Sequence, residues 1–90
     1  MLWMGIFTYE PEKRDELMKR RLAIGTGFPQ GLKLIGQWMD LTGHRSFSLV
    51  EAPDDPKLMV ASVMAWSDLG KFDIVPVMEA EEALKLMPRG

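Results

Sequence analysis

The chain has 90 residues, no cysteine and a formal net charge of −2, with 47% hydrophobic and 27% charged residues. These values are typical of a single small globular domain over residues 1–90, and they exclude disulfides and thiolate chemistry. Basic and acidic residues are interleaved without a basic stripe, so no nucleic-acid partner is expected. No apolar run is long enough to span a membrane and no signal-peptide pattern is present, so we expect a cytoplasmic protein without a membrane partner.

Apolar periodicity and turn residues divide the chain into four strands and three helices. The expected strands cover residues 2–9, 32–39, 45–51 and 72–78, and the expected helices cover residues 11–26, 58–66 and 80–87. The loop that contains Gly43 is short and polar, which predicts an antiparallel hairpin between the second and third strands. Asp54 or Asp55 is expected to cap the second helix, with Pro56 at its first position.

This order, β-α-β-β-α-β plus a short C-terminal helix, predicts a ferredoxin-like α+β fold. Right-handed crossovers place both longer helices on one face of a four-stranded antiparallel sheet, with the first and third strands in its centre. Pro76 fits this order because a proline inside a strand is tolerated at a sheet edge, where the fourth strand lies.

Neither face of the predicted sheet has the composition of a solvent face. Successive side chains point to opposite faces, and both alternating sets are apolar or mixed. The aromatic set contains Trp3, Phe7, Tyr9, Leu32, Leu34, Trp38, Phe47, Leu49, Glu51, Phe72, Ile74 and Met78. The mixed set contains Met4, Ile6, Thr8, Ile35, Gln37, Met39, Ser46, Ser48, Val50, Val75 and Val77.

We expect the aromatic set to face the helices, because the second helix offers the small residues Ala61, Ser62 and Ala65 to large rings. Two helices cover only one face, so the mixed set would leave a large apolar patch uncovered. The pattern therefore predicts a homodimer through the open sheet faces.

Three segments, GLKLIGQW, FSLVE before DDP, and WSDLGKFDIVPVM, carry a family resemblance. Its most specific positions are Gly31-Leu32-Lys33, Gly36, Trp38, Glu51, Trp66–Leu69 and Val75-Pro76-Val77. These segments resemble a family of small bacterial and archaeal proteins described only as a domain of unknown function. That family looks like a branch of the dimeric α+β barrel superfamily, which includes cofactor-independent monooxygenases, muconolactone isomerase, chlorite dismutases and stress-responsive barrel proteins. The resemblance implies the fold and the dimer, and it carries no activity.

Five residues are candidates for a ligand pocket between the sheet and the second helix: Tyr9, Gln37, Trp38, Glu51 and Trp66. The three aromatic residues are expected either to line the pocket or to belong to the core. Gln37 is expected to bond either a ligand carbonyl or a partner across the dimer. Glu51 shares the parity of Phe47 and Leu49, so it is either a catalytic base in an apolar compartment or a rim residue near the helix cap.

Two functions fit these residues. The first is a non-catalytic domain that binds a small apolar ligand between sheet and helices or at the dimer seam. The alternative is a cofactor-independent monooxygenase or isomerase that acts on an aromatic or enolisable small molecule. We expect no cofactor and no metal site, because His44 is the single histidine and lies in a polar turn. A haem role would require His44 to reach a pocket.

Overall fold

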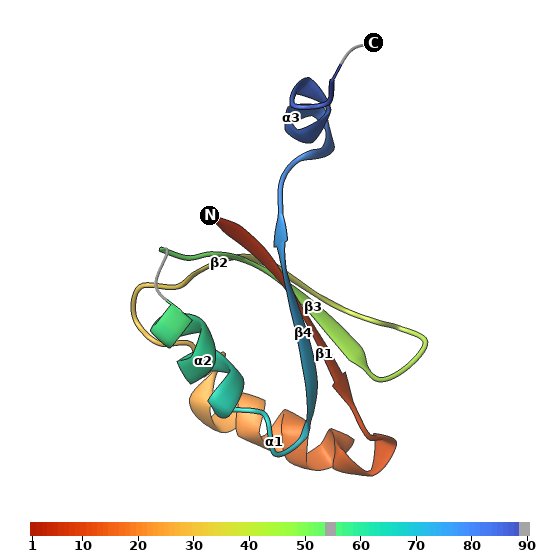
Figure 1. Cartoon of the computed structure of the whole chain (residues 1–90). Helices are drawn as coiled ribbons and strands as arrows, with labels where there is room; N and C mark the ends of the chain where they lie inside the picture. The colour runs from red at the N-terminus through yellow and green to blue at the C-terminus, as the bar shows by residue number, and fades with distance from the viewer. Residues whose placement is uncertain (54–55, 89–90) are drawn as a thin grey trace.

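Figure 1 shows the computed structural model of the chain, which describes residues 1–53 and 56–88. The strands are β1 (Leu2–Tyr9), β2 (Lys33–Met39), β3 (Arg45–Glu51) and β4 (Gly70–Val77). A 3-10 turn, η1 (Pro11–Lys13), leads into α1 (Arg14–Ile24), and the later helices are α2 (Pro56–Met64) and α3 (Ala80–Lys85). The sheet order is β2-β3-β1-β4 with every neighbouring pair antiparallel. The predicted ferredoxin-like fold is confirmed, with the first and third strands in the centre.

Local backbone chemistry explains where the observed elements differ from the expected ranges. The first helix ends at Ile24 because Gly25 adopts a φ of 69°, and its N–H donates to the Arg21 carbonyl at 2.9 Å. The strand β4 begins at Gly70, two residues earlier than expected. A Cβ at Gly70 would collide with the Thr8 carbonyl oxygen, so glycine permits the close approach of β1 and β4. The predicted caps Asp54 and Asp55 lie outside the described residues.

Both α1 and α2 lie on one face of the sheet (Figure 1), and the buried core cluster lies at one end of that layer. Its buried members come from β1, α1 and the segment that follows α2: Phe7, Tyr9, Leu17, Trp66 and Leu69. The ring of Phe7 stacks on that of Phe72 with centroids 4.5 Å apart. The helix layer is therefore anchored where β1 ends and β4 begins.

The pairing register corrects the predicted division of the sheet faces. Residues directly opposite each other in paired strands share a face. Phe7 on the helix side pairs with Ser46 and Phe72, whereas Phe47 pairs with Ile6 and Trp38. The aromatic set is thus split between the two faces.

The expectation was right for Trp3, Phe7, Tyr9, Phe72 and Ile74, which share the helix-facing side. It was wrong for Trp38, Phe47, Leu49 and Glu51, which lie on the open face, and for Gln37, Met39, Ser46, Ser48 and Val50, which face the helices. Alternation defines two sets within each strand but does not say which sets of neighbouring strands match. In β2 a register shift between Leu34 and Gly36 breaks the alternation as well.

The turn between β2 and β3 holds the register of this hairpin. The carboxylate of Asp40 accepts hydrogen bonds from the Thr42 backbone N–H at 2.9 Å and the Thr42 hydroxyl at 2.7 Å. Its second oxygen accepts one from Arg45 Nε at 3.1 Å. These bonds lower the pKa of Asp40 to about 2. The turn thereby sets Gln37 opposite Ser48.

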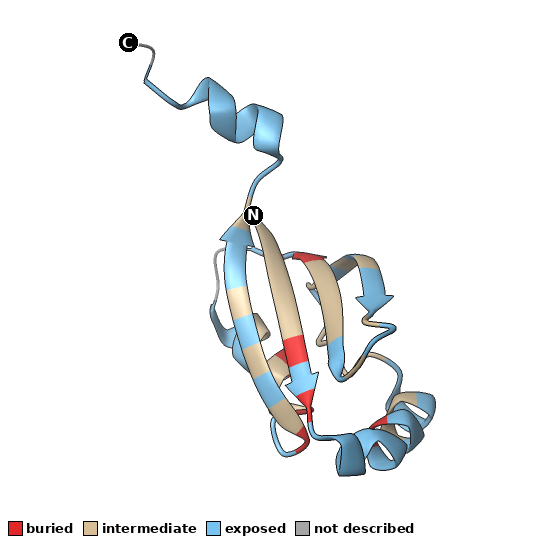
Figure 2. Ribbon diagram, turned by 90° about the vertical axis from the view of Figure 1, so that its right-hand side faces the viewer, coloured by how far each residue is buried: buried red, intermediate tan, exposed pale blue. Residues whose placement is uncertain are grey.

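The last helix, α3, stands apart from the sheet and the other helices (Figures 1 and 2). Every residue from Met78 to Pro88 is exposed, including the large apolar side chains Leu84, Leu86 and Met87. The longest dimension of the molecule is 52 Å, which includes this arm. No helix in the described ranges is both long and apolar enough to cross a bilayer.

An arginine on α1 joins that helix to the loop between α2 and β4. Arg20 Nη1 and Nη2 donate to the two carboxylate oxygens of Asp68 at 2.6 and 2.8 Å, and Nη1 also donates to the Ala65 carbonyl at 3.0 Å. The guanidinium lies 5.9 Å from the centre of the Trp66 ring. The bonds from Arg20 lower the pKa of Asp68 below its usual value.

Replacing Asp68 with asparagine should therefore lower the melting temperature at neutral pH. A carboxyl whose pKa is lowered by folding stabilises the folded state above its unfolded pKa of 3.8, and that contribution is lost as the pH falls through the lower folded value. The difference in melting temperature between wild type and Asp68→Asn, read from melting curves, should thus become smaller below pH 3.8. Glu12→Gln, at an exposed position in η1, serves as the control and should show no such gap. A pH-independent gap would contradict the role given to Arg20.

Candidate functional site

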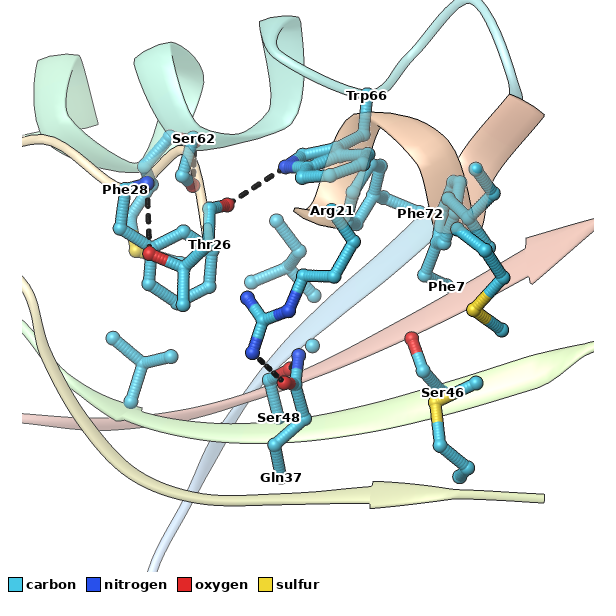
Figure 3. Close-up of a pocket in the computed structure, with 17 residues that line it drawn as sticks. Phe7, Arg21, Thr26, Phe28, Gln37, Ser46, Ser48, Ser62, Trp66 and Phe72 are labelled. Atoms are coloured by element: carbon cyan, nitrogen blue, oxygen red, sulfur yellow. Dashed lines mark hydrogen bonds between the residues drawn. The ribbon is translucent and has the colours of Figure 1, made fainter. Parts of the chain in front are cut away.

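A cavity of about 110 Å³ lies between the helices and the sheet (Figure 3). All four strands contribute side chains to its floor, and α1, the loop after α1, and the α2 region form its walls and roof. Its aromatic lining consists of Phe7, Phe28, Trp66 and Phe72. The lining is mainly apolar and includes a few polar groups, as is typical of small-molecule sites.

Small residues in the central strands explain why this space is empty. Gly5 of β1 lies opposite Ser48 of β3, and Phe7 lies opposite Ser46. A Cβ added to Gly5 would find only the Ser48 carbonyl oxygen nearby, at 3.9 Å, which is ordinary van der Waals contact. The middle of the helix-facing surface therefore lacks the large side chains that would otherwise fill a core.

Trp66 holds the loop after α1 over one side of the cavity. Its Nε1 donates to the Thr26 carbonyl at 2.8 Å, and only 6% of its surface is exposed. The Thr26 hydroxyl in turn accepts a bond from the Phe28 N–H at 3.2 Å. Gly27 has a φ of 68°, and a Cβ there would lie 3.1 Å from both Trp66 Nε1 and Ala65 Cβ. The loop is thus closely fitted to the indole ring.

A chain of polar side chains crosses the cavity from α1 to the sheet (Figure 3). Arg21 Nη2 donates to Gln37 Oε1 at 3.0 Å, and Gln37 Nε2 donates to the Ser48 hydroxyl at 3.0 Å. The bonds run in one direction, from a cation to a hydroxyl. Because Ser48 accepts this bond on its oxygen, its own proton is free to donate to another group.

The structure brings two of the five predicted pocket residues, Gln37 and Trp66, to the cavity. Tyr9 is buried in the core beside Phe7 and is not part of the cavity lining. Trp38 and Glu51 are exposed on the opposite face of the sheet, so they do not meet the other candidates. The cavity lies between sheet and helices, and of the four candidate residues on the strands only Gln37 lines it.

His44 lies exposed in the β2–β3 turn, where its carbonyl accepts a hydrogen bond from the Tyr9 N–H at 2.8 Å. Its ring meets that of Tyr9 edge-on, with centroids 6.2 Å apart. Within residues 1–53 and 56–88, no three histidine, aspartate or glutamate side chains cluster as metal ligands do.

Sequence reasoning missed Gly5, Arg21, Ser46 and Ser48 as site residues. Arg21 stands at the end of a run of charged residues, Glu10 to Arg21, which is typical of a solvated helix face. A usable signal was present in β1, where a glycine interrupts an otherwise apolar strand. Such a glycine often marks a place where a ligand or another chain approaches closely.

Replacing Trp66 with phenylalanine should lower the free energy of unfolding by about 2 kcal/mol, because the bond to Thr26 is lost and a void forms. Urea unfolding curves measure this change. Leu41→Ala, in an exposed turn, is the control and should change the free energy of unfolding by less than about 0.5 kcal/mol. Equal unfolding midpoints for Trp66→Phe and wild type would show that the indole does not hold the loop.

Comparison with known proteins supports the resemblance to a family of unknown function. No curated protein and no solved structure matches the chain. A family model described as a domain of unknown function matches all of residues 1–90. The chain therefore belongs to the DUF3303 family.

Proposed function

We propose that this protein is a homodimeric barrel domain that binds a small, mainly apolar ligand in the cavity between sheet and helices. The observation that carries the proposal is the hollow beneath the helices, which exists because Gly5, Ser46 and Ser48 occupy the centre of the sheet. Protein interiors are normally close-packed, and a void in a small domain lowers its stability. A ligand that fills the void restores the missing contacts.

The size of the cavity limits the ligand. An engineered apolar cavity of about 150 Å³ in another protein binds benzene. The volume here, about 110 Å³, is of the same order. Aromatic rings from three sides, Phe7, Phe28 and Trp66, offer flat apolar contact surfaces. We infer a ligand with about one ring or a short hydrocarbon chain.

The dimer part of the proposal rests on the open face of the sheet. Its apolar side chains are contiguous across all four strands: Leu2, Met4, Ile6, Trp38, Phe47, Leu49, Val75 and Val77. The Trp38 ring lies directly over Gly36, because a Cβ at Gly36 would fall only 2.6 Å from the ring. Trp38 is 54% exposed. Trp38 and Val75 are exposed and the other six are half-buried, and a contiguous apolar patch on a protein surface often marks an interaction site. Two sheets packed through these faces would cover it, as in the dimeric α+β barrels.

The enzyme alternative has less support from the residues. The candidate catalytic base for that function is Glu51, but Glu51 lies on the sheet face away from the cavity. The described lining of the cavity contains no carboxylate and no imidazole. A general base must come within hydrogen-bond reach of its substrate. We therefore favour binding over the monooxygenase or isomerase function.

The dimer is tested by placing a charge on the apolar face of the sheet, at Trp38 of the edge strand β2. Light scattering at micromolar concentration should give a dimer mass for wild type and a monomer mass for Trp38→Lys, because a buried unpaired ammonium opposes association. The conservative variant Trp38→Phe keeps an apolar ring and should remain dimeric. A monomer mass for wild type would contradict the interface.

Ligand binding is tested by filling the cavity. Gly5→Val should occupy the space beside Ser48 and suit a β-strand, so the variant should melt at or above the wild-type temperature. In thermal-shift assays with single-ring aromatic compounds, wild type should show a stabilising shift that Gly5→Val lacks. The same shift in both proteins would place binding outside this cavity.

A further inference from the structure

The charge of Arg21 is not balanced by an acid within the described part of the chain. Its side chain is partly buried and points into the cavity, where it makes a solvent-exposed hydrogen bond to the neutral Gln37 (Figure 3). The neighbouring Arg20, by contrast, is paired with both Asp68 and Glu16. Among the described cavity-lining residues, Arg21 is the one charged group.

A cation in such surroundings favours an anion. Hydrogen bonds between a guanidinium and an anion are stronger than those to a neutral group such as the Gln37 amide. The amide oxygen of Gln37 accepts one hydrogen bond from Arg21, and the other N–H groups of the Arg21 guanidinium remain available to a ligand. The guanidinium fork matches the two oxygens of a carboxylate.

The hydroxyl groups of the floor extend this recognition. Ser48 accepts its bond from Gln37, so its proton is free to donate, and Ser46 lies two residues away on the same side of β3. Donors aligned in a chain from Arg21 polarise one another in the same direction. All of them therefore favour an acceptor that carries negative charge.

We propose that the ligand of this cavity is a small carboxylic acid, whose carboxylate binds Arg21 and the serine hydroxyls while its apolar body lies among the aromatic rings. This inference rests on the proposed ligand-binding function and adds the chemical class of the ligand. A carboxylate is planar and compact, which suits a cavity of about 110 Å³ that also holds an apolar group.

Isothermal titration calorimetry with benzoate and benzyl alcohol tests the proposal. The two compounds have the same ring and differ in charge. Wild type should bind benzoate at least about tenfold more tightly, as expected for charge-assisted hydrogen bonds. Arg21→Met should lose that preference while its affinity for benzyl alcohol stays within about twofold. Added salt should weaken benzoate binding more than benzyl alcohol binding.

Two further variants separate the role of Arg21 from changes in net charge or folding. Lys19→Met removes one positive charge from an exposed position on the same helix and should keep the preference for benzoate. Arg21→Lys keeps the charge but not the fork, and should bind benzoate with intermediate affinity. If Arg21→Met does not fold, Arg21→Lys alone decides, because wild-type affinity in that variant would overturn the role of the guanidinium.

The outcomes distinguish this inference from the proposed function beneath it. Equal binding of benzoate and benzyl alcohol to wild type would overturn the carboxylate inference and leave the cavity as a binding site for apolar compounds. If the protein is correctly folded and binds neither compound, both the carboxylate inference and the proposed ligand-binding function are overturned. Preferential benzoate binding that Gly5→Val also shows would place the anion outside the cavity and overturn the inference.

Discussion

The centre of the helix-facing sheet surface carries too little side-chain volume to fill the space beneath the helices, and the other features depend on that shortage. Gly5 and Ser48 face each other across the two central strands. The buried core consequently forms at one end of the layer, around Phe7 and Trp66, instead of in its middle. Bonds outside the cavity hold the helices in place, most clearly the one between Arg20 and Asp68.

The order of elements follows from local patterns, so it was predictable. Proline and glycine mark the ends of helices. The strands of seven or eight residues and the helices follow one another in the ferredoxin-like order β-α-β-β-α-β. The pairing of faces was not predictable in the same way, because it depends on which residue of one strand lies opposite which residue of the next. Phe47 and Trp38 illustrate this: both are aromatic, and both lie on the open side.

The site was predictable only in outline for a related reason. Large residues such as Trp66 attract attention as pocket candidates, whereas a cavity is produced by small ones. Gly5 and Ser48 are informative only once the sheet register shows that they are opposite each other. Arg21 lies in a run of charges that reads as a solvated surface, and only the crossing of α1 over the sheet brings its side chain to Gln37.

The tryptophans lie in three separate environments, and this gives the protein its own optical probes. Trp66 forms part of the cavity wall, and Trp38 lies on the open sheet face. Trp3 lies on the helix-facing side, where its Nε1 is the one buried side-chain polar atom without a partner in the described residues. Single-tryptophan versions would therefore report occupancy of the cavity and coverage of the sheet as independent fluorescence signals, without an attached dye.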